Sequence, residues 1–179
     1  MATPAATSAT AASTKYAPLI SKVLRLYTSR DPKEQQQIIE THYAPNATFE
    51  DPLMIVHGPT NIISQFHALL SFFSSIDANE TPLNSIGSLK DTQPPQGESL
   101  ANGELISVPN TQIYRRGEPS KPKEIPIEAV THITVDKTSG KVLYHKDVWL
   151  NHKFENPSLV KKVSGASSSA IFKLFNVGG

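Results

Sequence analysis

The first third of the chain repeats its apolar residues with the period of an α-helix. Between residues 15 and 30 they recur every three or four positions, which predicts an amphipathic helix. The stretch "SRDPKE" starts a second helix, since Asp31 can serve as an N-cap and Pro32 suits the first helical position. This helix extends to about Tyr43. A third helix, from Pro59, has the clearest period, and its apolar face comprises Ile62, Ile63, Phe66, Leu69, Leu70 and Phe73.

After the third helix the apolar period shortens to two residues, which is typical of β-strands. A short strand, "NATFEDP", and an apolar patch, "MIVHGP", already precede that helix. Pro- and Gly-rich stretches separate the later strands, and "DKTSGK" predicts a tight hairpin turn. Strands joined by such connections pair antiparallel. The predicted later strands are residues 83–90, 103–115, 125–136 and 141–150.

This order predicts one α+β domain over residues 15–155, in which a curved antiparallel sheet packs against three N-terminal helices. A blind cavity is expected between the sheet and the helices. Residues 1–14 combine small and polar residues without an apolar stretch, so we expect a flexible tail. Residues 156–179 are expected to add a C-terminal helical segment, with Asn156 as its cap. Its apolar residues need a partner surface on this domain, a second copy or a membrane: Ile171, Phe172, Leu174 and Phe175.

The composition removes several classes of function. The 179-residue chain carries 17 basic and 16 acidic residues, and its formal charge of +1 gives no electrostatic basis for nucleic acid binding. The absence of cysteine excludes disulfides, thiolate chemistry and the usual structural zinc sites. No apolar run is long enough for a transmembrane segment, and the N-terminus has no secretory or transit signal, so we expect a cytoplasmic protein.

The stretch "GKVLYHKDVWLNH" gathers the strongest candidate chemistry. Because side chains of a strand alternate between two faces, one face carries Leu143, His145, Asp147 and Trp149. The α-carbons of His145 and Asp147 are then about 7 Å apart, so the two side chains could share one substrate. In a dry pocket the pKa of Asp147 would rise, as a general base requires, with His145 as its catalytic partner. The alternatives are a hydrogen bond at the rim or a salt bridge to a lysine of the neighbouring strand.

Three further residues are candidates for lining a ligand pocket. Trp149 has a large apolar body that suits either a pocket wall or the core. Phe66 lies on the apolar face of the third helix. Tyr114 shares a strand face with Asn110 and Gln112, and such phenol and amide groups can stabilise an oxyanion or lie on a solvated edge strand.

Two more candidates depend on geometry that the sequence leaves open. His132 faces the cavity only if the cavity lies on its side of the strand. The turn sequence does not reveal the register in which this strand pairs with the last one. Asp51, which precedes a proline, either caps a turn or points at the pocket mouth. The six histidines are dispersed and no metal-binding or phosphate-binding motif occurs, so we expect neither a metal nor another cofactor.

Three stretches together resemble a known family: "YAPNATFEDPLMIVHG" after two helices, "NIISQFHALL", and "GKVLYHKDVW" in the last strand. Over residues 15–155 the chain is similar to the nuclear-transport-factor-2-like superfamily, and within it to the SnoaL-like branch. The resemblance implies a cone-shaped fold with a mostly apolar cavity. Enzymatic members place an Asp or a His–Asp pair there, and the matching positions are Asp147, His145 and Asp51, with Trp149 in the wall. The superfamily includes isomerases, dehydratases, cyclases and non-enzymatic members.

We therefore expect a small hydrophobic molecule in the cavity, and whether the chain is an enzyme stays open. A cofactor-independent proton transfer of isomerase, dehydratase or cyclase type would use Asp147 as the base and His145 as its partner. The alternative is a non-catalytic interaction or dimerisation module whose cavity is filled by its own side chains. In a homodimer of that kind the exposed sheet face would carry Val142, Tyr144 and Val148. A lipid carrier is a third hypothesis.

Overall fold

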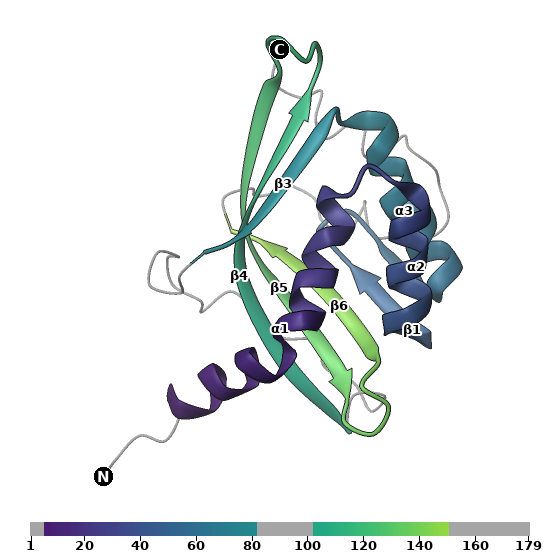
Figure 1. Cartoon of the computed structure of the whole chain (residues 1–179), viewed down its shortest axis with the longest axis vertical. Coiled ribbons are helices and arrows are strands. Elements are labelled where there is room, and N and C mark those ends of the chain that lie inside the picture. Colours follow the sequence, from purple (N-terminus) through teal and green to yellow (C-terminus); the bar gives the residue numbers. More distant parts are fainter. Residues whose placement is uncertain (1–5, 82–101, 151–179) are drawn as a thin grey trace.

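The computed structural model describes residues 6–81 and 102–150, and these form three helices and a six-stranded sheet (Figure 1). This confirms the predicted α+β class with three N-terminal helices on a curved sheet. The predicted strand 83–90 and the C-terminal segment 156–179 lie outside the described residues. The elements are α1 (Ala6–Thr28), α2 (Pro32–His42), β1 (Tyr43–Glu50), β2 (Ile55–His57), α3 (Pro59–Phe72), β3 (Ser75–Glu80), β4 (Gly103–Arg116), β5 (Lys123–Asp136) and β6 (Val142–Trp149).

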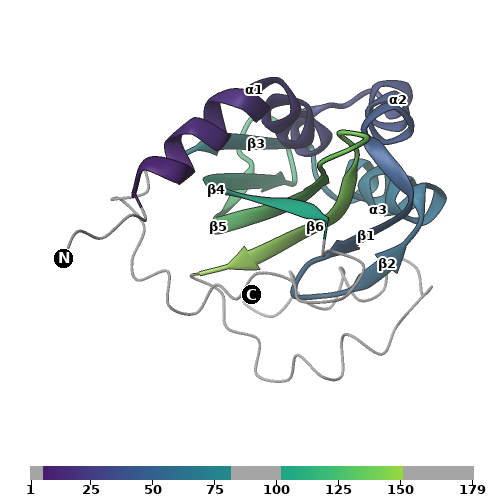
Figure 2. The same ribbon diagram turned by 90° about the horizontal axis from the view of Figure 1, so that it is seen from below.

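The sheet is curved, and the helices cover one of its two faces. Its strand order is β2-β1-β6-β5-β4-β3, and Figure 2 shows α1 and α2 along one side of it. All neighbouring strands are antiparallel except β1 and β6, which are parallel. A parallel pair needs a long crossover, and here the chain between β1 and β6 supplies it. The sheet is therefore mixed, with an antiparallel series from β3 to β6.

Local signals in the sequence account for where the helices and the hairpin begin. The Asp31 side chain accepts a hydrogen bond of 2.9 Å from the Lys33 amide and caps α2, as predicted. Gly58 precedes α3 with a φ of 79°, a conformation that disfavours residues with a side chain. Between β5 and β6 the Asp136 carboxylate accepts two backbone hydrogen bonds, and Gly140 adopts a φ of 69°. The predicted turn "DKTSGK" is thereby confirmed.

Two elements differ from the sequence-based expectation. The helix α1 begins at Ala6, inside the segment 1–14 that we expected to be a flexible tail. That segment is rich in alanine, the residue with the highest helix propensity. The strand β3 occupies Ser75–Glu80, a stretch that is not among the predicted strands. Its sequence is polar, but six residues of β4 pair with it along one edge.

The face of β6 predicted to carry the polar row is turned towards the helices. His145 is fully buried and Asp147 is 3% exposed, whereas Tyr144 and Lys146, on the opposite face, are half-buried. The even-numbered residues of β4 from Ile106 to Tyr114 are buried in the same way. These inward faces, together with α1 and α3, enclose the core.

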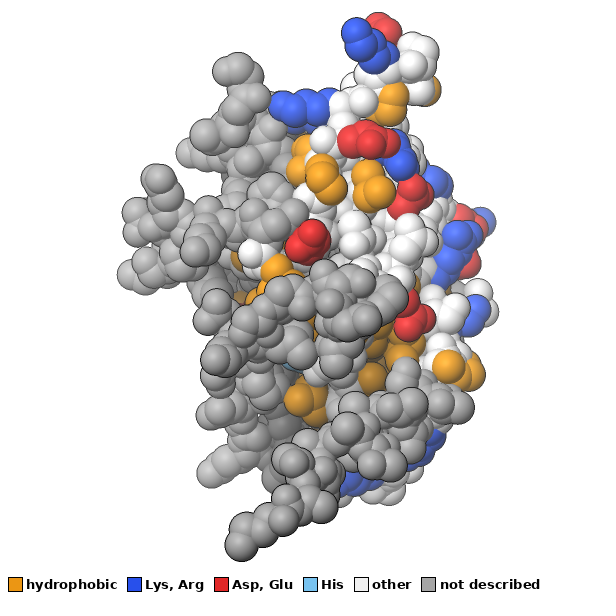
Figure 3. Space-filling view, turned by 90° about the vertical axis from the view of Figure 1, so that its left-hand side faces the viewer, with side chains coloured by type: hydrophobic (Ala, Val, Ile, Leu, Met, Phe, Trp, Pro, Cys, Tyr) orange, Lys and Arg blue, Asp and Glu red, His pale blue; other side chains and the backbone are white. Residues whose placement is uncertain are grey.

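The surface carries charges of both signs. Figure 3 views the molecule from the left-hand side of Figure 1, and the acidic and basic side chains visible there are interspersed. Arg115, for example, lies between Asp77 and Glu124, with a contact of 2.7 Å to each carboxylate. Within residues 6–81 and 102–150, no helix is long and apolar enough to cross a membrane.

Adjacent residues of β4 test this assignment of faces. Ile106 is 4% exposed and Leu105 is 42% exposed. Truncating Ile106 to alanine should lower the free energy of unfolding by about 2–4 kcal/mol, because it leaves a cavity in the core. The matched change Leu105→Ala should cost about 0.5 kcal/mol or less. Urea unfolding of both variants measures the difference, and equal costs would contradict the assignment.

Candidate functional site

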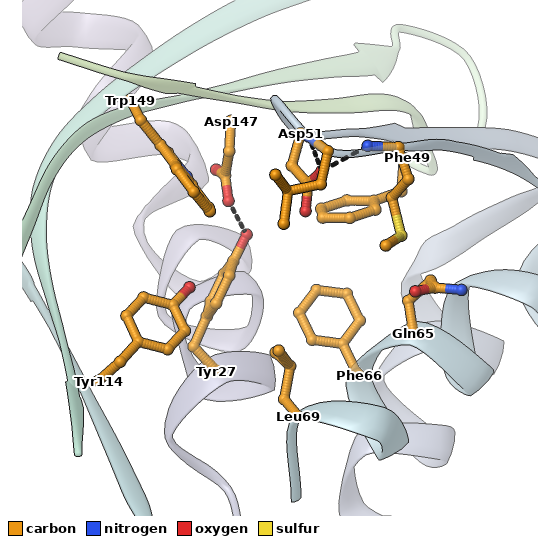
Figure 4. Close-up of a pocket in the computed structure, with 11 residues that line it drawn as sticks. Tyr27, Phe49, Asp51, Gln65, Phe66, Leu69, Tyr114, Asp147 and Trp149 are labelled. Atoms are coloured by element: carbon orange, nitrogen blue, oxygen red, sulfur yellow. Dashed lines mark hydrogen bonds between the residues drawn. The ribbon is translucent and has the colours of Figure 1, made fainter. Parts of the chain in front are cut away.

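A pocket opens between the helices and the inner face of the sheet (Figure 4). Its cavity volume is about 30 Å³, room for roughly two water molecules. Aromatic and aliphatic side chains form most of its walls, and two carboxyl groups are its acidic members. The lining residues are Tyr27, Phe49, Asp51, Leu53, Met54, Gln65, Phe66, Leu69, Tyr114, Asp147 and Trp149.

Asp147 is the buried carboxylate of this pocket. The Tyr27 hydroxyl, from α1, donates a hydrogen bond of 2.5 Å to its Oδ2, and Figure 4 shows this bond. The Thr131 hydroxyl, from β5, donates one of 2.6 Å to Oδ1. Each carboxylate oxygen therefore has a donor from a different element. Because a carboxylate is charged, hydrogen bonds to it are shorter and stronger than those to a neutral acceptor.

The surroundings of Asp147 favour its ionised form. Burial alone raises the pKa of this carboxyl group, but the neighbouring His145 and the hydroxyl donors of Thr131 and Tyr27 lower it more. The net pKa lies below the usual range. Asp147 is therefore a carboxylate at neutral pH, which differs from the raised pKa that the sequence predicted for it.

His145 lies behind the pocket rather than in its lining. Its Nε2 is 2.9 Å from the Tyr27 hydroxyl and its Nδ1 is 2.8 Å from the Tyr43 hydroxyl. Nε2 is 3.7 Å from the Asp147 carboxylate, too far for a hydrogen bond. Because the Tyr27 proton is donated to Asp147, the Nε2 proton of His145 must be donated to Tyr27. The imidazole ring stacks on Phe66, with 6.2 Å between ring centroids.

A chain of side-chain hydrogen bonds runs along β4 and ends at Asp147. The Asn110 amide nitrogen donates to the Val108 carbonyl and to the Thr131 hydroxyl, at 2.9 Å each. This leaves the Asn110 oxygen to accept from Gln112, whose own oxygen accepts from Tyr114 at 2.6 Å. We call this series, from Tyr114 through Gln112, Asn110 and Thr131, the β4 chain. The two amides are fully buried within it, so the predicted oxyanion role does not fit them.

Asp51 combines the two roles that the sequence left open for it. Its Oδ1 accepts hydrogen bonds from the backbone amides of Leu53 at 2.7 Å and Met54 at 2.8 Å, and it lines the pocket. Burial raises its pKa, the two backbone hydrogen bonds oppose the rise, and the charges of Asp147 and Glu50 add to it. The resulting pKa is about 7, so this carboxyl group exchanges its proton near neutral pH.

The structure brings most of the predicted site residues together. The pocket is lined by five of them, Asp51, Phe66, Tyr114, Asp147 and Trp149, and His145 supports it from behind. Two residues of the site, Tyr27 in the apolar stripe of the first helix and Thr131, were not among the predicted site residues. A hydroxyl group inside an otherwise apolar stripe was the available signal for Tyr27.

The prediction that His132 lines the pocket is wrong. The register of the β5–β6 hairpin places Thr131 opposite Asp147, and His132 opposite Lys146 on the other face of the sheet. There the His132 Nδ1 lies 2.9 Å from the Ser107 hydroxyl. A shift of one residue moves every side chain of a strand to the other face, which is why the sequence alone could not decide.

Comparison with known proteins defines the fold of the chain but not its chemistry. Neither a family model nor a curated protein sequence matches it. Among solved structures, a nuclear transport factor 2-like protein of unknown function from Exiguobacterium sp. 255-15 shares 12% identity at a TM-score of 0.55, over 75% of this chain and 99% of that protein.

Two further structures have names that refer to cyclisation. A candidate SnoaL-like polyketide cyclase from Shewanella denitrificans OS-217 shares 15% identity at a TM-score of 0.52, over 76% of this chain and 90% of that protein. The second is SalBIII, an epoxide hydrolase/cyclase-like enzyme of pyran ring formation in the polyether salinomycin. It shares 17% identity at a TM-score of 0.52, over 77% of this chain and 92% of that protein. The chain therefore has the nuclear transport factor 2-like fold with SnoaL-like structural neighbours, as its motifs predicted.

Removing the Tyr27 donor should be costly and should change the charge of its acceptor. We expect Tyr27→Phe to lower the free energy of unfolding by about 1–3 kcal/mol, since a buried carboxylate loses a hydrogen bond. The pKa of Asp147 should rise in this variant, which carbon-13 NMR of the labelled carboxyl group measures. In the control Tyr16→Phe, the hydroxyl that is removed bonds Glu104 in a less buried place, and the pKa of Asp147 should not change.

Asp51 should destabilise the folded protein at neutral and higher pH. Its pKa is about 7 in the folded state and 3.8 ordinarily, so the folded state binds the proton more tightly. Stability therefore falls as pH rises from about 4 to about 7, and then levels off. Asp51→Asn keeps an acceptor for the two backbone amides and should remove this decline, gaining about 1–4 kcal/mol at pH 8. Urea unfolding between pH 4 and 8 provides the test, and a variant less stable at pH 8 would contradict it.

Proposed function

We propose that the pocket binds a small, mostly apolar molecule and transfers a proton on it without a cofactor, in a reaction of isomerase, dehydratase or cyclase type. The observation that carries this proposal is the pair of carboxyl groups, Asp51 and Asp147, in one largely apolar pocket. Their surroundings displace the two pKa values in opposite directions. Such a pair is the usual arrangement of a general acid and a general base.

The two carboxyl groups take different roles. Asp147 is ionised at neutral pH and acts as the base, the role that the sequence suggested for it, although its lowered pKa makes it a weaker base than the sequence predicted. Asp51, with a pKa of about 7, holds a proton near neutral pH and acts as the acid. His145 is a positioning residue, because it reaches Asp147 only through the Tyr27 hydroxyl.

The apolar walls assist this chemistry by excluding water. Phe49, Phe66, Leu69 and Trp149 surround the space in front of the carboxyl groups (Figure 4). Electrostatic interactions are stronger where water is absent, so a charge that develops on the ligand responds more strongly to Asp147. The names of the structural neighbours, which include a candidate polyketide cyclase and an epoxide hydrolase/cyclase-like enzyme, agree with this class of reaction.

The small cavity favours a second candidate function. About 30 Å³ is far below the volume of an ordinary ligand pocket, so a bound molecule must displace side chains such as Met54. A domain whose interior is almost filled suits a non-catalytic interaction or dimerisation module. Light scattering of the purified protein, together with a screen for bound small molecules, separates this candidate from the first.

A small β,γ-unsaturated ketone, 3-cyclohexen-1-one, tests the proposed proton transfer. Its conversion into the conjugated isomer requires removal and return of a proton and is followed by ultraviolet absorbance. We expect Asp147→Asn and Asp51→Asn each to lower kcat/KM by about 10²-fold or more, as loss of a general acid or base does. In the unmutated protein kcat/KM should fall as pH rises through about 7, because Asp51 loses its proton there.

The exposed Asp77 provides the matched control. Asp77→Asn removes a carboxylate that pairs with Arg115 at the surface, and it should leave the rate unchanged. Unchanged turnover in both pocket variants would remove the two carboxyl groups from the mechanism. Binding of the ketone without any turnover would favour the non-catalytic candidate.

A further inference from the structure

Two hydroxyl groups are hydrogen-bonded to Asp147, and both donate their protons to its carboxylate. Tyr27 and Thr131 have one hydroxyl proton each, and each donates it to Asp147. The Asn110 amide nitrogen donates to the Val108 carbonyl, which fixes the orientation of this amide, and also donates to the Thr131 oxygen. Because the Thr131 oxygen accepts this hydrogen bond, its own proton is directed to Asp147. The direction of the Thr131 hydrogen bond is therefore set by the backbone of β4.

This wall consequently offers a ligand acceptors but no hydroxyl donor. The carboxylate has about four lone-pair positions, of which Tyr27 and Thr131 occupy two. His145 does not take a third, since its Nε2 is 3.7 Å away and donates to Tyr27 instead. Asp147 thus retains capacity for a further donor from the pocket side, where it belongs to the lining.

The charge of the pocket also favours a ligand that carries a hydrogen-bond donor. Among the described residues that line it, none is a lysine, an arginine or a histidine. A buried carboxylate attracts a donor or a cation strongly in such surroundings, whereas an anionic ligand would meet an unbalanced like charge. Aromatic rings, including those of Phe49, Phe66 and Trp149, can also lie against a cationic group.

We propose that the ligand presents a hydrogen-bond donor, an O–H or N–H group, to Asp147, and that the pocket rejects anions and molecules with only an acceptor at this end. This arrangement is the reverse of an oxyanion hole, which places donors against a developing negative charge. The inference rests on the proposed function only in using the same pocket as the binding site.

Four molecules with the same five-membered ring test the inference: cyclopentanol, cyclopentylamine, cyclopentanone and cyclopentanecarboxylate. Their dissociation constants are measured on the full-length protein by amide NMR titration, without any turnover. We expect the alcohol and the amine to bind at least tenfold more tightly than the ketone, and the carboxylate not to bind. If the amine binds more tightly than the alcohol, its positive charge adds to the affinity that the hydrogen bond provides. If the alcohol binds more tightly, the hydrogen bond alone accounts for the preference.

Two variants assign the preference to Asp147. Asp147→Asn introduces an amide donor and should reduce the preference for the alcohol over the ketone to about one or reverse it, while the surface variant Asp77→Asn keeps it. Equal binding of alcohol and ketone, binding of the carboxylate, or binding of none of the four overturns the inference. If the donor preference is found but turnover of 3-cyclohexen-1-one is the same in Asp147→Asn, Asp51→Asn and the unmutated protein, the inference stands and the proposed chemistry is rejected. Turnover that depends on Asp51, in a protein that shows no preference for a donor, would support the proposed chemistry and overturn the inference.

Discussion

The burial of one carboxylate constrains much of this structure. Asp147 is 3% exposed, and a charge so far from water persists only where hydrogen bonds replace its hydration. Those bonds come from Tyr27 on α1 and Thr131 on β5, and each donor is itself held from behind, by His145 and Asn110 respectively. Through these contacts one charge on β6 links α1, β4 and β5, so the polar network fixes how the helical layer sits on the sheet.

The pocket joins this fixed polar wall to a more adaptable apolar mouth. Gln65, Leu69 and Trp149 are half-buried, and Met54 has a flexible side chain. Removal of the Asp147 carboxylate, by contrast, would break the hydrogen bonds from both Tyr27 and Thr131. Under the proposed function, discrimination between ligands would therefore depend on the polar wall, and tolerance of their size on the mouth. This division suits a fold whose members carry many different reactions.

Sequence patterns predicted the elements and one face of the site, but not the partners that meet there. The alternation in β6 correctly placed His145, Asp147 and Trp149 on one face, because that period is a property of the strand itself. Tyr27 and Thr131 reach Asp147 from 120 and 16 residues away, through packing and hairpin register that no local pattern encodes. The misplacement of His132 has the same origin.

Asp51 shows why two interpretations of one residue need not exclude each other. The hydrogen bonds from Leu53 and Met54 that make it a turn residue also hold its carboxyl group at the edge of the pocket. They stabilise the charged form and so work against a raised pKa, yet burial and the charge of Asp147 prevail. The pKa of about 7 is thus due mainly to burial, and the ionised state of the neighbouring Asp147 adds to it. If the donors of Tyr27 and Thr131 were lost, Asp147 would gain a proton more easily, and the contribution of its charge to the raised pKa of Asp51 would disappear.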